Sequence, residues 1–334
     1  MRKLLFSMMI LSLFFSSATA KTVIKLGTTA PKASNWYQIL KEMGFLWKEA
    51  TGGEVTLRIL AGGKLGNESE MIKKMRIQQI QAAAISAAGL AEIDRSAYAV
   101  MIPLMFESYE EWDYVREEMN QDMEKRLQEK GFHVLTWSDV GWVHFFSKQP
   151  MQTPAELEKM KLAASVTQPV IVEITKWAGF RPVPITTADM VAGLQTGLID
   201  AFYVPIYVAE ASNLYRYAKN MNGLKWAPLQ GAVVIRSEDW NKVGSEHRAK
   251  IREIARQIGE KLRRETRGRE SASLEAMKKR GLKVWEVDDE TRKEWYQRTT
   301  AAYPKIRNEL LTPEVFDKVL RLREAYRAGK AEGR

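Results

Sequence analysis

Hydrophobic and polar residues alternate along most of the chain, in the two periods that distinguish strands from helices. Residues 54–60 alternate polar and apolar side chains, which predicts a half-buried strand. Residues 82–85 are a short apolar run, which predicts a buried strand. Ser34 is placed to cap a helix that Gly52 and Gly53 end. Strand-like and helix-like segments follow one another in this way, which predicts an α/β architecture.

The same hydrophobic pattern predicts an ordered set of strands and helices after residue 20. We expect strands at residues 22–27, 54–60, 82–85, 133–137, 142–147, from 161, 181–184, 198–204, 232–235 and 282–287. We expect helices at residues 34–51, around 68–75, 108–130, 168–178, 187–196, 245–280, 289–305 and 312–328, with a short one after Thr153 and Pro154. The sequence has no solenoid repeat, low-complexity block or Gly/Ser linker. We therefore expect a chain that crosses between two lobes more than once, which would allow hinge closure around a ligand.

The N-terminus has the three parts of a secretory signal peptide. Arg2 and Lys3 are positive, residues 4–15 are apolar, and Ala18 and Ala20 form the A-x-A pattern before a cleavage site. The alternative is a short membrane anchor, but a bilayer span needs about 20 apolar residues. The chain has no cysteine, which excludes a lipoprotein anchor. We predict a signal peptide at 1–20, cleavage near Ala20 and a periplasmic location.

Composition narrows the class of protein. A chain of 334 residues predicts about two domains. The formal charge is +10, and many of the basic residues lie at 261–280, interleaved with glutamates as on a solvated helix face. We expect no nucleic-acid partner, because no recognised binding motif accompanies this charge. The charge fits solubility or docking to an acidic partner.

The residues of common catalytic and metal sites are missing or scattered. Without cysteine, neither thiol catalysis nor a thiolate metal site is possible. His133, His144 and His247 are far apart in the sequence and form no H-E-x-x-H motif. Nucleophile-elbow, P-loop and dinucleotide-binding motifs are also absent. We predict that the protein is not an enzyme and has neither a cofactor nor a metal.

Five segments together carry a family resemblance. They are KLGTTAPKASNWYQILKEMGFLWKEATGGEVTLRI, AGGKLGNESEMIKKM, PLMFESYEEWDYV, GFHVLTWSDVGWVHFFSKQPMQTPAELEKMKL and GLQTGLIDAFYVP. Their order and spacing resemble the solute-binding subunits of tripartite ATP-independent periplasmic (TRAP) transporters, over nearly the whole chain after residue 20. The resemblance implies two α/β lobes joined by hinge strands and spanned by a long helix. It also implies capture of a small solute in the cleft and delivery to a permease driven by an ion gradient.

On this resemblance we assign lobe I to residues 21–142 and 233–275. Lobe II takes residues 143–232 and 276–334.

The chain departs from the family at positions that usually contact the ligand. On this resemblance, the principal carboxylate-binding arginine falls at Ala163, a second basic residue of many acid-binding members falls near Val143, and an asparagine that often contacts the ligand falls at Val204. The glutamate that usually precedes the Ala-Leu-Gln run falls at Asp189 or Ala188. A buried carboxylate without a cation costs several kcal/mol, and arginine supplies two parallel hydrogen bonds that alanine and valine cannot. We therefore expect a hydrophobic or uncharged organic ligand.

The candidate ligand-binding residues are mostly aromatic or small. They are Trp36, Tyr37, Trp142, Phe145, Ala163, Phe202, Tyr203 and Val204, with His144 and Arg181 as possible polar contacts. Each has a plainer alternative, because aromatic residues usually pack in cores and Arg181 resembles a strand-edge residue. Phe202 and Tyr203 are neighbours on one strand, so only one of them is expected to face the cleft.

Other functions remain open at this stage. A periplasmic ligand-sensing subunit could share the fold, and an organic-acid binder could use a different cation such as Arg181. An ABC-type binding protein is disfavoured by the central motif. Some arginine-lacking members of the family work with a periplasmic helical-repeat protein, which makes such a protein a candidate partner beside the permease.

Overall fold

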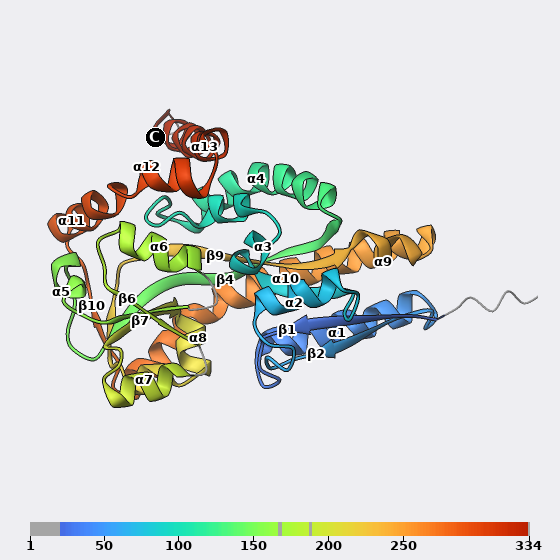
Figure 1. Cartoon of the computed structure of the whole chain (residues 1–334), viewed down its shortest axis with the longest axis horizontal. Helices are drawn as coiled ribbons and strands as arrows, with labels where there is room; N and C mark the ends of the chain where they lie inside the picture. The colour runs from blue at the N-terminus through green and yellow to red at the C-terminus, as the bar shows by residue number, and fades with distance from the viewer. Residues whose placement is uncertain (1–20, 166–168, 187–188, 333–334) are drawn as a thin grey trace, which may run out of the picture.

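The structure is a computed structural model that describes residues 21–165, 169–186 and 189–332. It has the alternating helices and strands that the sequence predicts (Figure 1). The first part of the chain forms β1 (Thr22–Thr28), α1 (Asn35–Ala50), β2 (Val55–Leu60), α2 (Glu68–Arg76), β3 (Ala82–Ser86), α3 (Ala87–Ala91), the 3-10 helix η1 (Arg95–Met101) and α4 (Tyr109–Glu129).

The middle of the chain forms the second lobe between two long crossing strands. The elements are β4 (Phe132–Ser147), α5 (Pro154–Glu158), β5 (Leu162–Ser165), α6 (Pro169–Trp177), β6 (Pro182–Ile185), α7 (Met190–Thr196), β7 (Ala201–Pro205), α8 (Ile206–Ala211), η3 (Leu214–Arg216), β8 (Asn220–Asn222) and β9 (Ala227–Arg236). The tail follows as α9 (Ser237–Lys242), α10 (Ser245–Lys279), β10 (Lys283–Trp285), α11 (Asp289–Thr300), α12 (Tyr303–Lys305), the π-helix η4 (Ile306–Leu310) and α13 (Pro313–Glu332).

The strands of the described residues form one sheet that runs through both lobes. Its order is β2-β1-β3-β9-β4-β7-β5-β6, with β8 and β10 branching from β4. The pairs at each end, such as β1 with β2 and β5 with β6, are parallel. In the middle, β4 and β9 are antiparallel to each other. Two parallel α/β halves are therefore joined by an antiparallel strand pair, which confirms the predicted two-lobed α/β fold.

β4 is longer than predicted. The sequence indicated two strands, at 133–137 and 142–147, but the structure has one strand with register shifts between Val134 and Thr136 and between Asp139 and Gly141. Gly141 has a φ of 109°, which a residue with a side chain rarely adopts. The polar, glycine-containing segment between the two apolar runs is therefore an irregularity inside a strand rather than a loop.

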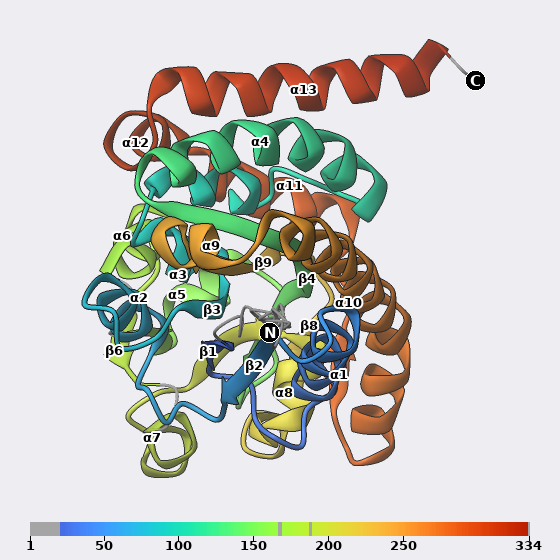
Figure 2. The same cartoon turned by 90° about the vertical axis from the view of Figure 1, so that its right-hand side faces the viewer.

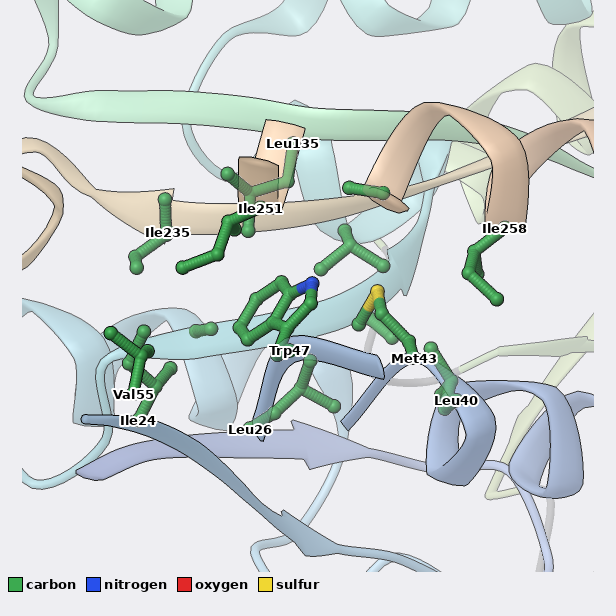
Figure 3. Close-up of a cluster of buried hydrophobic side chains, with 14 of the residues drawn as sticks. Ile24, Leu26, Leu40, Met43, Trp47, Val55, Leu135, Ile235, Ile251 and Ile258 are labelled. Atoms are coloured by element: carbon green, nitrogen blue, oxygen red, sulfur yellow. The ribbon is translucent and has the colours of Figure 1, made fainter. Parts of the chain in front are cut away.

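Helix α10 connects the two lobes. Its first half packs on α1, where Ile251 and Ile258 join Trp47 and Met43 in a fully buried cluster with β1 (Figure 3). Near its end, Met277 packs with residues of β4 and β7 in the second lobe. The lobe-spanning helix implied by the family resemblance is thus present.

The C-terminal helix α13 lies along α4 (Figure 2). Val315, Phe316 and Val319 share a buried cluster with Trp112 and Val115 of α4. α13 therefore contacts the part of the chain assigned to lobe I, although the expected boundaries place it in lobe II. The boundaries themselves stay a prediction.

Two findings bear on the class of protein. Of the helices in the described part of the chain, none is long and apolar enough to cross a bilayer. Among the same residues, His, Asp and Glu side chains do not gather in a group that could hold a metal ion. The predicted signal peptide at 1–20 lies outside the described residues.

Candidate functional site

An apolar cavity of about 70 Å³ lies where the two lobes meet. The first lobe contributes η1 and the turn after it, the second lobe contributes α6 and β7, and the crossing strands and η4 complete the wall. The lining residues are Tyr98, Met101, Ile102, Pro103, Val143, Ile171, Ile174, Thr175, Tyr203, Trp226, Ala227, Ile306 and Leu310. None of these described side chains carries a charge.

The polar side-chain groups among these lining residues are three hydroxyl groups and the indole N–H of Trp226. The Thr175 hydroxyl donates to the carbonyl of Ile171 at 2.7 Å and lies 3.3 Å from the Tyr203 hydroxyl. A threonine hydroxyl has one hydrogen, so the Tyr203 O–H donates to Thr175. Tyr98 is 5% exposed, and its hydroxyl has no hydrogen-bond partner among the described residues. The cavity therefore presents one uncommitted phenol.

Burial keeps both phenols protonated. It raises the pKa of Tyr203 to about 12, an effect that the contact with Thr175 opposes. The pKa of Tyr98 is raised further, first by burial and then by the nearby charges of Glu92 and Glu68. Both side chains are therefore neutral hydrogen-bonding groups at physiological pH.

Glu68, at the start of α2, is not a lining residue but lies near enough to Tyr98 to influence its pKa. Its carboxylate accepts hydrogen bonds from the Ser86 hydroxyl at 2.6 Å and the Ser86 backbone N–H at 2.9 Å, where α3 begins. Burial raises the pKa of Glu68, although bonds from Ser86 and the Gly89 backbone oppose the shift. Burial raises the pKa of Tyr207 to about 12, and the nearby Glu68 contributes a smaller part of this shift. Glu68 thus holds the β3–α3 turn through Ser86 and supplies no positive charge near Tyr98.

Val143, near which the family's second basic residue falls, and the candidate aromatic residue Tyr203 both line the cavity. They lie on β4 and β7, which pair so that Val143 is opposite Pro205 and Phe145 is opposite Tyr203. The neighbour of Tyr203, Phe202, points to the other face and stacks on Phe146 at 5.1 Å between ring centroids. Of Phe202 and Tyr203, Tyr203 is the one that faces the cavity.

The other aromatic candidates lie in hydrophobic cores. Trp142 is fully buried beside Tyr109, and Phe145 lies 4.9 Å from Trp226 between ring centroids. Trp36 is 8% exposed and belongs to the first-lobe core. In this conformation these rings contact protein side chains, which agrees with the alternative that they pack in cores.

The remaining small and polar candidates are also away from the cavity lining. Ala163 is buried beside Phe202, and Val204 packs against the same cluster. Tyr37 is half-buried near the start of α1. The Arg181 side chain is exposed, and its carbonyl accepts a hydrogen bond from the Leu162 N–H. A ligand contact by any of these residues stays a prediction.

His144 is buried in the hinge rather than in the cavity wall. Its Nδ1 lies 3.2 Å from the Asn222 carbonyl oxygen, and its Nε2 lies 4.0 Å from a Glu270 carboxylate oxygen. Burial lowers the pKa of His144 to about 4, and the charge of Lys225 contributes in the same direction. The imidazole is therefore neutral at pH 7.

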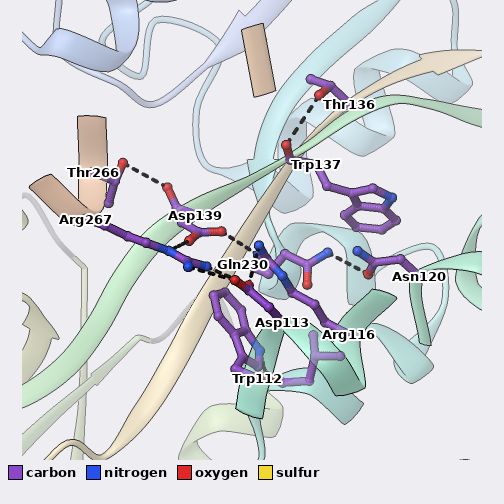
Figure 4. A network of polar contacts seen from close by, with 11 residues as sticks. Trp112, Asp113, Arg116, Asn120, Thr136, Trp137, Asp139, Gln230, Thr266 and Arg267 are labelled. Carbon is purple, nitrogen blue, oxygen red and sulfur yellow. Dashed lines mark hydrogen bonds and ion pairs between the residues drawn. The ribbon is translucent and has the colours of Figure 1, made fainter. Parts of the chain in front are cut away.

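Behind the hinge, a network of buried charges ties three elements together (Figure 4). Asp139 of β4 is fully buried and pairs with Arg116 of α4 and with Arg267 of α10. Arg267 also holds both carboxylate oxygens of Asp113, at 2.6 and 2.7 Å. Burial alone would lower the pKa of Arg267, but its bonds to the two aspartates raise it. The network fixes the lobe-spanning helix to the irregular part of β4.

Comparison with known proteins assigns the family. The sequence pattern of the family described as "Bacterial extracellular solute-binding protein, family 7" matches residues 26–309. The chain belongs to this family. The expected resemblance to TRAP solute-binding proteins is thereby confirmed.

The relatives of this family 7 protein support the same assignment. The 2,3-diketo-L-gulonate-binding periplasmic protein of Escherichia coli is 24% identical over 276 residues, covering 82% of this chain and 84% of the relative. A TRAP solute-binding protein of Haemophilus influenzae with bound L-gulonate has a TM-score of 0.84 at 18% identity, covering 91% of this chain and 100% of that one. A TRAP protein of Fusobacterium with bound sn-glycerol-3-phosphate has a TM-score of 0.84 at 22% identity, covering 93% and 99%.

Family membership settles the general role. The protein is a periplasmic, non-enzymatic solute-binding protein of the TRAP type, as expected. Proteins of this kind bind small ligands and work with membrane permease subunits. Cleavage of a signal peptide near Ala20 stays a prediction.

Several residues that line the cavity of this family 7 protein were not anticipated from the sequence. Tyr98, Thr175, Trp226, Ile306 and Leu310 come from four separate parts of the chain. No motif marks any of them, and the fold alone brings them together. Glu68 did carry a signal, because it occupies the glutamate position of the Leu-Gly-Asn-Glu turn that resembles the family's pattern.

Proposed function

We propose that this TRAP solute-binding protein captures a small, uncharged and mostly apolar organic solute between its lobes and delivers it to an ion-gradient-driven permease. One observation carries the proposal: the cavity at the lobe junction is lined by apolar side chains and by uncharged polar groups, namely hydroxyls and one indole N–H. Val143 stands in its wall, and the family resemblance implies a basic residue near this position in many acid-binding members. A carboxylate in this cavity would have no cation to offset its loss of hydration.

The ligands of the relatives belong to a different chemical class from the one proposed here. 2,3-Diketo-L-gulonate, L-gulonate and glycerol-3-phosphate are all acids. Arginine suits such ligands because its planar group donates two parallel hydrogen bonds to an acid group. Here Ala163 is buried among Phe146, Phe202 and Ile185, and no arginine lines the cavity in the described residues. We therefore assign this chain a different ligand class within the shared role.

Two alternatives are less well supported. Arg181 could serve an acidic ligand only if it turned inward, because its side chain is exposed and absent from the cavity wall. A ligand-sensing role would use the same cavity, and no observation favours it over transport. A periplasmic helical-repeat partner stays a prediction.

Isothermal titration calorimetry tests the ligand class. The purified protein, freed of bound solute by unfolding and refolding, would be titrated with L-gulonate and with D-glucuronate. We expect no saturable binding of either acid up to about 1 mM. Micromolar affinity for either acid would contradict the proposal.

A further inference from the structure

Tyr98 and Tyr203 face the same cavity from opposite lobes. Tyr98 belongs to η1 of the first lobe, and Tyr203 belongs to β7 of the second. The remaining lining residues are apolar apart from the Thr175 hydroxyl and the Trp226 indole N–H. Each lobe thus contributes one phenol oxygen to a mostly apolar space.

The two phenols are not equivalent. The Thr175 hydrogen is used on the Ile171 carbonyl, at 2.7 Å, so Tyr203 donates its own hydrogen to Thr175. The Tyr203 oxygen then offers a ligand only its lone pairs. Tyr98 is 5% exposed, and within the described residues its hydroxyl has no partner, so its hydrogen remains available. The pair presents one donor from the first lobe and one acceptor from the second.

We infer that the ligand carries an uncharged hydroxyl group, an alcohol, which accepts a hydrogen bond from Tyr98 and donates one to Tyr203. This inference rests on the proposed function and narrows its ligand class. A ketone or ester can satisfy Tyr98 but leaves the Tyr203 oxygen without a donor. A hydrocarbon leaves the Tyr98 hydrogen and the Tyr203 lone pairs without partners, and buried polar groups without partners are costly.

The arrangement also links ligand binding to closure. A hydroxyl held by both tyrosines makes contacts to both lobes only when the lobes are closed, so it favours the closed conformation. The cavity of about 70 Å³ is smaller than an engineered apolar cavity of about 150 Å³ that holds benzene. A six-carbon alcohol needs more room than this, so its binding requires the cavity walls to move apart.

The test compares three probes with one carbon ring and different polar groups. Cyclohexanol, cyclohexanone and cyclohexanecarboxylate would each be titrated into the ligand-free protein by calorimetry. We expect cyclohexanol to bind about 5-fold more tightly than cyclohexanone, the effect of one hydrogen bond, and the carboxylate not to bind.

Three variants assign the selectivity to the two phenols. Tyr98→Phe should lower the affinity for the alcohol and for the ketone alike by about 5-fold, because both accept a hydrogen bond from Tyr98. Tyr203→Phe should abolish the preference for alcohol over ketone. Tyr114→Phe removes a hydroxyl from a side chain that is 46% exposed and should leave the affinities unchanged. If Tyr203 has a merely structural role, Tyr203→Phe lowers the affinities for both probes equally and keeps the ratio of the two affinities.

The outcomes separate the inference from the proposed function. Equal binding of alcohol and ketone, an alcohol preference that survives Tyr203→Phe, or no saturable binding of cyclohexanol would overturn the inference. The proposed uncharged ligand would stand in these cases if the carboxylate also failed to bind. Binding of the carboxylate more tightly than the alcohol would overturn both.

Discussion

Asp139 is a buried carboxylate whose charge is compensated by two arginine partners. It is fully buried, and Arg116, which is 2% exposed, pairs with it from α4. Arg267 of α10 pairs with its second oxygen at 2.6 Å. Removing one member of such a group leaves a buried charge poorly compensated.

We predict that Asp139→Asn lowers the free energy of unfolding by about 3 kcal/mol, the cost of breaking a buried ion pair. Urea unfolding at pH 7 would measure it. Glu253→Gln provides a control, because the exposed pair of Glu253 and Arg256 on α10 should leave the urea midpoint unchanged. An equal midpoint for Asp139→Asn and the parent protein would show that the network does not stabilise the hinge.

His144 gives the protein a pH dependence of known sign. Its pKa is lowered to about 4 in the folded state by burial, whereas an unfolded histidine titrates near 6.5. Between these values the unfolded chain binds the proton and the folded chain does not, so stability is lost as pH falls. The full loss is about 3 kcal/mol, from about 1.4 kcal/mol per pH unit.

Comparison with His144→Gln isolates this effect from other titrating groups. Urea midpoints at pH 7.5, 6.5, 5.5 and 4.5 should fall more steeply for the parent protein than for the variant. Glu270, 4.0 Å from the imidazole, is kept in both proteins. Parallel curves would mean that His144 is protonated equally in both states.

At the scale of residues, the sequence predicted the site only in part. The family pattern drew attention to Val143 as a position near a missing basic residue and to Tyr203 as a candidate aromatic, and both line the cavity. A ligand contact by either stays a prediction. Trp142 lies on the opposite face of β4 from Val143, because side chains alternate along a strand. Phe145 shares the face of Val143 but packs against Trp226 and Trp295. Tyr98 lies in a 3-10 segment without any motif, so only the folded chain places it beside Tyr203.

At the scale of elements, α10 contains two glycines with opposite surroundings. A Cβ added at Gly259 would lie 2.0 Å from the Thr136 hydroxyl oxygen and 2.4 Å from the Trp137 carbonyl oxygen. A Cβ added at Gly268 would have no atom within 4 Å. Gly259 is therefore required for the close approach of α10 to β4, and Gly268 is not.

We predict that Gly268→Ala raises the free energy of unfolding by about 0.5–1 kcal/mol, because alanine favours the helix. Gly259→Ala should lower it by about 1–3 kcal/mol, because the added methyl forces α10 away from β4. Thermal unfolding of both variants checks the pair. Stabilisation by Gly259→Ala would contradict the packing of α10 on β4.

Many elements were predictable because their ends carry local signals. Ser34, Ser108 and Thr153 accept hydrogen bonds from backbone N–H groups at the starts of α1, α4 and α5, as their positions indicated. The single long strand β4 was not predictable, because Ser138 to Gly141 has the composition of a turn. Its partner β9 is also longer than the apolar run at 232–235, since pairing with β4 extends it.

At the scale of the molecule, the two lobes meet at a cavity whose walls come from both. The crossing strands β4 and β9 and the helix α10 form the connection, and the charged network holds α10 to β4. Solute capture by such a protein requires that the ligand stabilise the closed form. Contacts to Tyr98 from one lobe and to Tyr203 from the other fit this requirement.

The most direct test of the account is native mass spectrometry of the small molecule that co-purifies with the periplasmic protein. The account predicts a bound, uncharged and mostly apolar compound with a hydroxyl group, released on unfolding and identified by its mass and fragments. A bound sugar acid or dicarboxylate would contradict it.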